Sequence, residues 1–214
     1  RDLHYPLRRQ RQMCIRDRYN IAPSQGVLTV LNTGDLRTSL TRWGLVPPWE
    51  KGDTPGRGFI NARAETLSEK PSFRDLYRKR RCIIIASGFY EWKAVPGGPK
   101  IPHYFKLASG APFGFAGLWS PWKNTRCEET VTSAIITTSA NKLLATVHDR
   151  MPVILNPADI PLWLSPGDMP PHSLQQLLAP YAAKAMTGHG VSARVNSPAF
   201  DEPACVAPSA GPAG

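Results

Sequence analysis

CIIIASGFY, residues 82–90, is the stretch that predicts the fold most clearly. Its β-branched and aromatic residues favour extended strands, and the Ser87–Gly88 pair inside it is small and flexible. Similar short runs lie on both sides, punctuated by Pro and Gly: VLTVL (27–31), LTRWGLV (40–46), HYFKL (103–107), FGFAGLW (113–119) and VTSAIITT (131–138). So many strands at close spacing predict a strongly curved, barrel-like sheet.

Helical patterns are fewer and shorter. Ser72 is expected to cap a turn through FRDLYRK, Ser139 to cap ANKLLATV, and HSLQQLLAPYAAKAM (172–186) has apolar residues near helical spacing. Strands and helices do not alternate as βαβ units, so we predict an α+β fold. A chain of 214 residues fits one mixed domain of ordinary size.

The two ends of the chain differ in character from its middle. Residues 1–18 carry six arginines and two aspartates without any apolar period, and the tract RQMCIRDR within them resembles a translated sequencing-adapter remnant. Residues 201–214 are rich in Pro, Ala and Gly. We therefore expect a disordered or non-native basic leader over 1–18, the domain over 19–200, and a disordered tail over 201–214.

Bulk composition excludes several classes of protein. No apolar stretch approaches the roughly 20 residues that span a bilayer, so we expect a cytoplasmic protein, on the nucleoid if it is bacterial. The four cysteines form no C-x-x-C pair, so we expect no disulfide framework, metal or cofactor. A net charge of +10 favours a polyanionic partner.

Polar residues in the segment NARAET, residues 61–66, alternate with alanines. On a strand, Asn61, Arg63 and Glu65 share one face, and an amide, a guanidinium and a carboxylate together can bind a polar ligand. The alternative is an Arg63–Glu65 surface pair beside a capping Asn61. Spacing alone does not separate the two interpretations.

Two further segments place titratable groups beside apolar strands. Glu91 lies between Tyr90 and Trp92, where desolvation raises the pKa of a carboxyl and suits it to proton transfer; the alternative is an exposed glutamate on an edge strand. VHDRMPVIL (147–155) places His148 and Arg150 before an apolar strand. They can move protons and bind phosphate, or they can simply face the dipole at a helix C-terminus.

Aromatic and basic residues offer a surface for nucleic acid. RWGLVPPW (42–49) sets Trp43 and Trp49 around two prolines, which suits stacking of unpaired bases, although tryptophans more commonly fill a core. RDLYRKRR (74–81) is by default a solvated helix face, but a phosphate-binding patch has the same pattern. No Walker loop, G-x-S-x-G elbow or H-E-x-x-H helix is present.

Taken in order, seven blocks resemble the successive motifs of the SOS-response-associated peptidase (SRAP) family. They are YNIAPSQ (19–25), RWGLVPPW (42–49), NARAET (61–66), CIIIASGFYEW (82–92), FGFAGLW (113–119), IITTSAN (135–141) and VHDRMPVIL (147–155). The resemblance implies a barrel-like domain that binds single-stranded DNA and covalently captures abasic sites. In that family the reacting residue is an N-terminal cysteine, exposed by self-removal of what precedes it. Its α-amine forms an imine with the sugar aldehyde, and its thiol then closes a thiazolidine ring.

The resemblance also implies roles for residues of this chain. Asn61 would position the cysteine and the sugar, Glu91 would move protons beside the amine, and His148 would assist ring opening. Arg63 and Arg150 would hold phosphates, while Trp43 and Trp92 would pack against bases. The expected partner is single-stranded DNA with abasic sites, bound by a monomer.

The cysteine is where the chain departs from this pattern. Met13–Cys14 resembles the family's start, but the nitrogen of Cys14 is an amide, so Cys14 cannot form a thiazolidine in the chain as written. Only four residues separate Cys14 from Tyr19, so we expect the native first segment to be missing from this sequence. Two other functions stay open: a peptidase acting on other proteins, and a non-catalytic module that binds single-stranded DNA.

Overall fold

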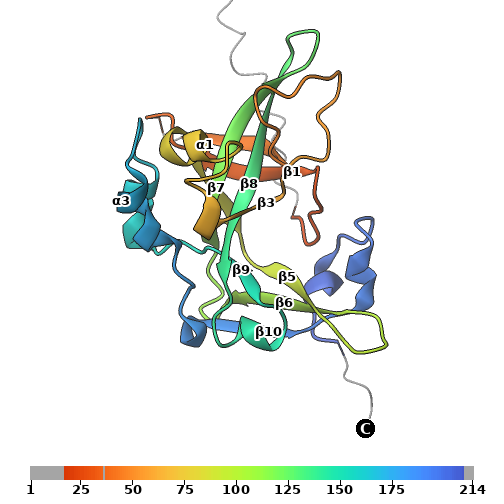
Figure 1. Cartoon of the computed structure of the whole chain (residues 1–214). Coiled ribbons are helices and arrows are strands. Elements are labelled where there is room, and N and C mark those ends of the chain that lie inside the picture. The colour runs from red at the N-terminus through yellow and green to blue at the C-terminus, as the bar shows by residue number, and fades with distance from the viewer. Residues whose placement is uncertain (1–16, 36, 210–214) are drawn as a thin grey trace, which may run out of the picture.

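The computed structural model describes residues 17–35 and 37–209. Five strands close into a barrel, with antiparallel pairing between neighbours except for one parallel pair (Figure 1). The strand order is β2-β1-β4-β7-β8, and β2 also pairs with β8, which closes the ring. The strands are β1 (Gly26–Leu31), β2 (Thr38–Trp43), β4 (Arg81–Ala86), β7 (Phe113–Lys123) and β8 (Glu129–Ser139). The predicted α+β fold with a curved, barrel-like sheet is confirmed.

Two short strands extend the barrel sheet, and a second sheet lies beside it. β3 (Asn61–Arg63) runs parallel to β8, and β9 (Arg150–Pro152) runs antiparallel to β8. The second sheet has the order β10-β6-β5, made by β5 (Phe89–Lys93), β6 (Ile101–Leu107) and β10 (Met186–Gly190). It lies below the barrel in the view of Figure 1.

The run CIIIASGFY crosses from one sheet to the other. It was expected as one run, but β4 ends at Ala86 in the barrel and β5 begins at Phe89 in the second sheet. Gly88 lies at this crossing, where an added Cβ would approach the Tyr104 ring to 2.2 Å. Only glycine fits there without a shift of Tyr104, so the break in the strand follows from close packing.

Buried side chains form three clusters that explain why β4 is apolar on both faces. Ile83 belongs to the cluster that packs the helices onto the outside of the barrel, and Cys82 and Ile84 belong to the barrel interior. The interior cluster continues through Phe89 and Phe105 into the second sheet. The third cluster covers the other face of that sheet with residues of the C-terminal segment.

The helices are short and only partly as predicted. They are α1 (Arg74–Lys79), α2 (Ile160–Trp163), α3 (Pro171–Gln175) and the 3-10 turns η2 (Ala64–Thr66), η3 (Leu144–Thr146), η4 (Pro157–Asp159), η5 (Gln176–Leu178), η6 (Ala183–Ala185), η7 (Ala193–Asn196) and η8 (Pro203–Val206). The predicted helix over 172–186 is wrong beyond residue 178, because Pro180 forces Ala179 into an extended conformation. Figure 1 shows α1 and α3 on one side of the barrel.

Both expected serine caps are wrong. The residue before α1 is Phe73, and it has no side-chain cap, while Ser72 lines a pocket. Ser139 ends β8, and the turn that follows is capped by Asn141, whose Oδ1 accepts hydrogen bonds from the N–H groups of Leu143 and Leu144 at 3.0 Å. A side-chain cap was therefore correctly expected after β8, but it lies two residues beyond Ser139, while α1 has none.

Arg81 is fully buried in the described structure, in contrast to the solvated helix face expected for RDLYRKRR. Its guanidinium donates to the carbonyl oxygens of Tyr77 and Arg78 at the end of α1, and to those of Trp163 and Ser165 after α2. These carbonyls lack partners within their own helices, and a cation there also opposes the helix dipoles. Arg81 thus joins two helix C-termini.

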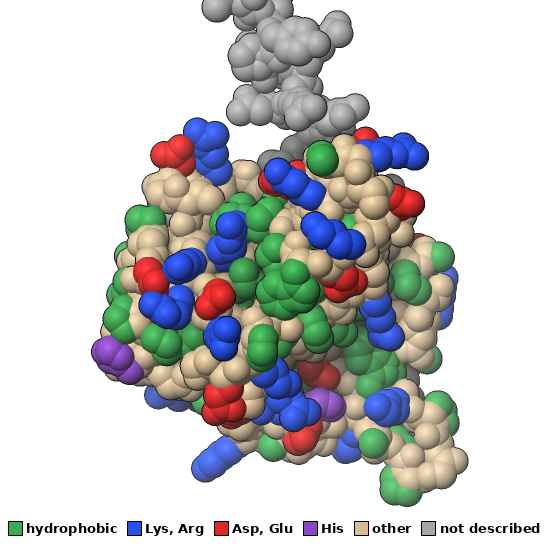
Figure 2. Space-filling model, turned by 45° about the horizontal axis from the view of Figure 1, so that its top comes forward, with side chains coloured by type: hydrophobic (Ala, Val, Ile, Leu, Met, Phe, Trp, Pro, Cys, Tyr) green, Lys and Arg blue, Asp and Glu red, His purple; other side chains and the backbone are tan. Residues whose placement is uncertain are grey.

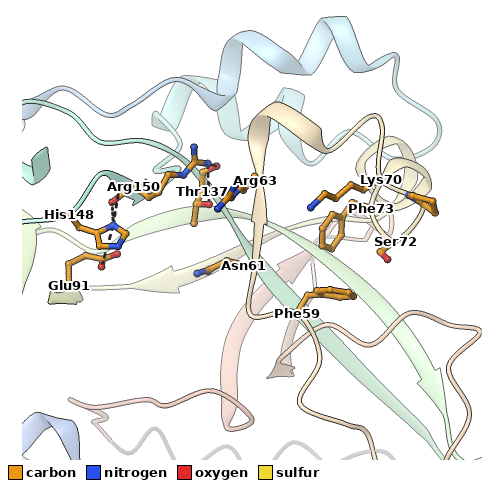
Figure 3. Close-up of a pocket in the computed structure, with 11 residues that line it drawn as sticks. Phe59, Asn61, Arg63, Lys70, Ser72, Phe73, Glu91, Thr137, His148 and Arg150 are labelled. Carbon is orange, nitrogen blue, oxygen red and sulfur yellow. Dashed lines mark hydrogen bonds and ion pairs between the residues drawn. The ribbon is translucent and has the colours of Figure 1, made fainter. Parts of the chain in front are cut away.

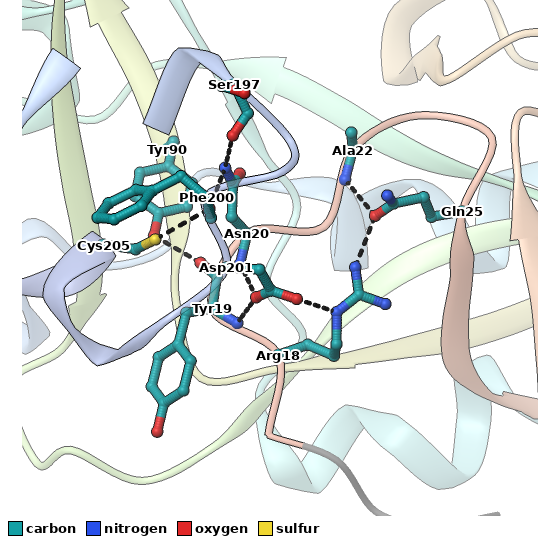
Figure 4. Close-up of polar contacts among 10 residues, drawn as sticks. All are labelled: Arg18, Tyr19, Asn20, Ala22, Gln25, Tyr90, Ser197, Phe200, Asp201 and Cys205. Atoms are coloured by element: carbon teal, nitrogen blue, oxygen red, sulfur yellow. Dashed lines mark hydrogen bonds and ion pairs between the residues drawn. The ribbon is translucent and has the colours of Figure 1, made fainter. Parts of the chain in front are cut away.

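The segments entering and leaving the domain are joined by a polar cluster, shown in Figure 4. The Asp201 carboxylate accepts hydrogen bonds from the backbone N–H groups of Tyr19 (2.6 Å) and Asn20 (2.9 Å) and pairs with Arg18. The Asn20 side chain donates to three carbonyls between residues 195 and 200. We call Arg18, Tyr19, Asn20 and Asp201 the terminal clasp.

The terminal clasp corrects the expected boundaries. Residues 201–209 are not a disordered tail, because Pro203–Val206 forms η8 and Cys205 is fully buried. Arg18 likewise belongs to the domain, since it pairs with Asp201. Residues 1–16, with Cys14, and residues 210–214 lie outside the described residues. Among the described helices, none is long and apolar enough to cross a membrane.

Candidate functional site

A pocket of about 830 Å³ lies where β3, β8 and β9 of the barrel sheet meet β5 of the second sheet (Figure 3). Its lining includes Asn61, Glu91 and His148, which are three of the four residues expected to do chemistry, together with Arg63 and Arg150. The fourth, Cys14, lies outside the described residues. The lining of the pocket consists of Phe59, Asn61, Arg63, Lys70, Pro71, Ser72, Phe73, Glu91, Thr137, His148 and Arg150. Segments that are 30 and 57 residues apart therefore converge on one cavity.

Asn61 and Arg63 reach the pocket because β3 alternates as expected. Ala62 and Ala64 are 1% and 4% exposed and face the core, while Asn61 and Arg63 are exposed on the opposite face. β3 lies beside β8 with Arg63 opposite Thr137, another residue of the lining. The small alanines let β3 pack closely, and the polar residues between them form one wall of the pocket.

Glu91 lies on an edge strand, yet its carboxylate is largely buried. β5 is the last strand of the second sheet, but the Glu91 side chain is only 22% exposed. Burial raises the pKa of Glu91, and Asp149 raises it further, while His148 and Lys100 lower it. The alternative of an exposed edge-strand glutamate is thus wrong for the side chain, and the carboxyl retains its proton to a higher pH than usual.

His148 follows a 3-10 turn and points into the pocket. Its backbone N–H closes the turn on the Leu144 carbonyl at 2.8 Å, and its Nδ1 accepts a hydrogen bond from the Arg150 backbone N–H at 3.0 Å. Nδ1 lies 4.0 Å from Glu91 Oε2 and 3.3 Å from Asp149 Oδ1. Nδ1 also lies 3.3 Å from the Arg150 carbonyl oxygen. When Nδ1 accepts the N–H bond, a neutral imidazole carries its proton on Nε2, and when Nδ1 is protonated it donates to that carbonyl. The helix-end position was expected, but the ring also faces Glu91.

The two arginines of the pocket differ in their surroundings. Arg150 makes a two-pronged ion pair with Glu65, at 2.6 and 2.9 Å, and also donates to the Thr137 carbonyl at 2.7 Å. This ion pair lowers the pKa of Glu65. The Arg63–Glu65 surface pair considered above is therefore wrong, because Glu65 pairs with Arg150, and Arg63 remains exposed in the wall of the pocket.

The aromatic residues of the pocket are not those expected. Trp43 is half-buried against the barrel interior and donates to the Ile60 carbonyl at 2.9 Å. Trp92 donates to Asn196 at 2.8 Å, and strand alternation places it on the opposite face of β5 from Glu91. The lining contains Phe59 and Phe73, whose ring centroids lie 5.2 Å apart in an edge-to-face arrangement. Phe59 is 44% exposed, so it presents ring surface to a ligand.

The chemistry available in this pocket is proton transfer on a polar ligand flanked by anions. A carboxyl whose pKa is raised by burial, beside an imidazole, can give and take protons. Asn61 can both donate and accept hydrogen bonds, and Arg63 and Lys70 supply positive charge. Within residues 17–35 and 37–209, no group of three His, Cys, Asp or Glu side chains is placed to bind a metal ion.

Comparison with known proteins identifies relatives over most of the chain. The family described as SOS response associated peptidase (SRAP) matches residues 3–198, a match that begins within the segment expected to be foreign. Abasic site processing protein YoqW of Bacillus subtilis (strain 168) is 49% identical over 186 residues, covering 86% of this chain and 83% of that protein. Abasic site processing protein HMCES of Gallus gallus is 33% identical over 191 residues, covering 78% of this chain and 56% of that protein.

A solved structure has the same architecture. The crystal structure of a protein from Bacteroides thetaiotaomicron superposes with a TM-score of 0.77 at 29% sequence identity, covering 87% of this chain and 82% of that one. The likeness therefore extends over most of the fold of both chains.

Proposed function

Because the chain belongs to the SOS response associated peptidase (SRAP) family, we propose that it processes abasic sites in single-stranded DNA at the pocket of Asn61, Glu91 and His148. Relatives over most of the chain are named abasic site processing proteins. The observation that carries the proposal is the convergence of an amide, a buried carboxyl and an imidazole on one cavity with arginines in its wall.

An abasic sugar presents the chemistry that these groups can serve. It exists mainly as a closed hemiacetal, and opening the ring exposes an aldehyde. In the proposal, His148 and Glu91 move the protons of ring opening, because the two groups lie 4.0 Å apart and Glu91 has a raised pKa. Asn61 hydrogen-bonds to the sugar and fixes its orientation. The open aldehyde is then the electrophile for the covalent step.

The proposed covalent step uses an N-terminal cysteine. Its α-amine adds to the aldehyde and loses water to give an imine, and its thiol then adds to the imine carbon, so that a five-membered thiazolidine forms. Glu91 is the group that removes a proton from the attacking amine and returns it to the departing hydroxyl. The cysteine and the aldehyde together give the thiazolidine and one molecule of water.

The described cysteines do not suit this step. Cys82 and Cys205 are buried, and burial raises the pKa of the Cys82 thiol. Cys127 is exposed in the loop between β7 and β8, and none of the three lines the pocket. Cys14 has the right preceding residue, but it can react in this way only after cleavage of the Met13–Cys14 bond has freed its amine. Self-directed cleavage of this kind is the peptidase activity that we propose.

A peptidase acting on other proteins has less support. Nucleophilic peptidases place a hydroxyl or thiol within hydrogen-bond reach of the base that activates it. In the described part of the chain, the polar contacts of the His148 ring are with Arg150, Asp149 and Glu91, none of which is such a nucleophile.

DNA contacts in the proposal follow the lining of the pocket. Arg63 and Arg150 hold the phosphates on either side of the lesion, and Phe59 stacks against a neighbouring base, since aromatic rings bind any base in a single strand. Lysine and arginine side chains also surround a central group of hydrophobic ones on the face shown in Figure 2. Positive and apolar side chains on one face suit the binding of a single strand.

The test is a denaturing gel of single-stranded DNA that carries one abasic site, incubated with the purified protein. Once cleavage after Met13 has freed the Cys14 amine, we expect a heat-stable species of lower mobility with abasic DNA and none with the intact strand. The chain that retains residues 1–13 should form no such species.

Glu91→Gln and His148→Ala should slow formation of the heat-stable species, while Glu69→Gln and His172→Ala, which change exposed residues outside the pocket lining, should not. Intact-mass spectrometry then identifies the N-terminus of the protein in the species. Processing that is unchanged in both pocket variants would refute the proposed site.

A further inference from the structure

We propose that Glu65 is a positioning residue for DNA binding, because its carboxylate holds the Arg150 guanidinium in the orientation from which Arg150 binds a phosphate. The proposal rests on the function proposed above, in which Arg150 contacts the DNA. Glu65 itself does not line the pocket, so its effect on a ligand passes through Arg150.

Glu65 and Thr137 together hold the Arg150 guanidinium. Besides the bonds that follow, Nη2 lies 3.4 Å from the Thr137 hydroxyl. Nη1 donates to Glu65 Oε1 at 2.6 Å, Nη2 donates to Glu65 Oε2 at 2.9 Å, and Nη2 also donates to the Thr137 carbonyl at 2.7 Å. Two parallel N–H bonds to one carboxylate set both the position and the plane of a guanidinium. The carbonyl bond then prevents rotation about the axis of the ion pair.

Most of the N–H groups of Arg150 are already used within the protein. A guanidinium has five N–H groups, and the bonds to Glu65 and the Thr137 carbonyl use one N–H of Nη1 and both N–H groups of Nη2. Nε is buried and has no acceptor among the described residues. The second N–H of Nη1 is therefore the donor that Arg150 can offer to a phosphate, and its direction depends on the Glu65 contact.

The three strands that form this wall of the pocket meet at the same ion pair. Glu65 lies in η2, the turn that follows β3, and β3 carries Asn61 and Arg63. Thr137 belongs to β8, and Arg150 begins β9. The backbone N–H of Arg150 also binds His148 Nδ1 at 3.0 Å. Holding Arg150 therefore also fixes the strand that orients His148.

Simple electrostatics predicts the opposite effect of Glu65 on DNA binding. A carboxylate near a phosphate site repels the phosphate, so its removal should strengthen binding to a polyanion. Positioning predicts weaker binding after removal, because an unheld arginine loses side-chain freedom when it binds. The sign of the change thus separates the two accounts.

The experiment measures binding of a fluorescent single-stranded oligonucleotide by anisotropy to the full chain. We expect Glu65→Gln to weaken binding about tenfold, equivalent to the loss of one charge-assisted hydrogen bond. The matched control is Glu69→Gln, which removes the same charge from an exposed residue four positions along, and we expect equal or slightly tighter binding. Glu65→Asp keeps the charge but shortens the side chain, so positioning predicts weaker binding and repulsion predicts no change.

A double-mutant cycle shows whether Glu65 acts through Arg150. Arg150→Gln should weaken binding, and Glu65→Gln added to it should weaken binding no further. Thermal denaturation establishes that each variant is folded at the assay temperature. If Glu65→Gln is not folded at that temperature, the binding of Glu65→Asp is compared with the wild type instead.

Two results would overturn the inference while leaving the proposed function in place. One is tighter binding by Glu65→Gln, as for the Glu69 control, and the other is an equal loss on adding Glu65→Gln to the Arg150→Gln protein. Failure of the wild-type chain to bind single-stranded DNA would instead overturn the proposed function itself, and the inference with it.

Discussion

Replacing Asp201 with alanine should separate the two ends of the domain, because this carboxylate connects the terminal clasp. The change removes two hydrogen bonds from backbone N–H groups, those of Tyr19 at 2.6 Å and Asn20 at 2.9 Å, and an ion pair with Arg18. The Asp201 side chain is 14% exposed, so water only partly replaces it as an acceptor.

The magnitude follows from these three contacts. Hydrogen bonds to a charged group contribute about 1.5–3 kcal/mol each, and a partly exposed ion pair contributes about 0–1 kcal/mol. Asp201→Ala should therefore lower the free energy of unfolding by about 3–7 kcal/mol. In a domain of this size that corresponds to a fall in Tm of about 6–28 °C.

Asp201→Asn serves as a graded control. Both backbone N–H groups bind Oδ1, which the asparagine retains, so this variant loses the Arg18 pair and the charge but keeps two neutral hydrogen bonds. We expect a loss of about 2 kcal/mol, between the wild type and Asp201→Ala.

The effect should also depend on pH. Hydrogen bonds from Tyr19, Asn20 and Arg18 lower the pKa of Asp201 in the folded protein, although burial opposes them. A lowered pKa means that the contribution of the carboxylate is present above its ordinary pKa and is lost as the pH falls through the folded value. The Tm difference between the wild type and Asp201→Asn should thus be largest near neutral pH and should narrow below about pH 4. Circular dichroism melts that show equal Tm values at pH 7, or a difference that does not change with pH, would refute this account of the clasp.

Three further predictions concern buried and pocket charges. Arg81→Met should lower the free energy of unfolding by about 3–5 kcal/mol in urea titrations, because it leaves carbonyls at two helix ends unpaired. The control is Arg80→Met: the Arg80 guanidinium lies over the Trp119 ring, and its loss should change the free energy of unfolding by less than about 1 kcal/mol. Equal losses in the two variants would contradict the role of Arg81. Glu91→Gln should raise the Tm at neutral and alkaline pH but not in acid. Burial raises the pKa of Glu91, so the stability contributed by the protonated carboxyl is lost as the pH rises through the pKa of the folded protein. A Tm difference that is the same at every pH would exclude this cause. Arg63→Gln should lower the slope of log affinity for single-stranded DNA against log salt by about 0.7–1, while Arg126→Gln, in the exposed loop before β8, should leave it unchanged; a slope unaffected by Arg63→Gln would place the DNA elsewhere.

Local sequence patterns predicted the parts of the pocket that depend on alternation and burial. The alanines at 62 and 64 indicated which face of β3 is buried, and so placed Asn61 and Arg63 together. The aromatic neighbours Tyr90 and Trp92 indicated a desolvated carboxyl at Glu91, in agreement with the direction of its pKa. The first prediction needs only a period of two residues along one strand, and the second needs only the adjacent residues.

Features that depend on contacts between distant segments were missed. The partner of Glu65 is 85 residues away, so spacing suggested Arg63 instead. Phe59 and Phe73 resemble ordinary core residues in sequence, and only the meeting of β3 with the segment before α1 brings their rings to the pocket. β10, with the sequence MTGHG, has weak strand propensity, yet an added Cβ at Gly188 would lie 2.4 Å from the Phe105 ring, so the glycine is what allows this strand to pair with β6.

The structure of residues 201–209 could not be predicted from their composition either. Pro, Ala and Gly predict disorder because they provide little apolar surface, but Cys205 packs with Val191 and Val195 into the third cluster. Asp201 then binds backbone at residues 19 and 20, more than 180 positions earlier in the chain. No pattern within the segment itself indicates that partner.

A structure of the protein bound to a single-stranded oligonucleotide with a tetrahydrofuran abasic analogue tests the central claim most directly, because the analogue cannot react and its position does not depend on any cysteine. We predict that the tetrahydrofuran ring lies in the 830 Å³ pocket within hydrogen-bond reach of Asn61, beside Glu91 and His148, with its flanking phosphates at Arg63 and Arg150. A complex in which the strand is bound but the abasic sugar lies outside this pocket would contradict the account.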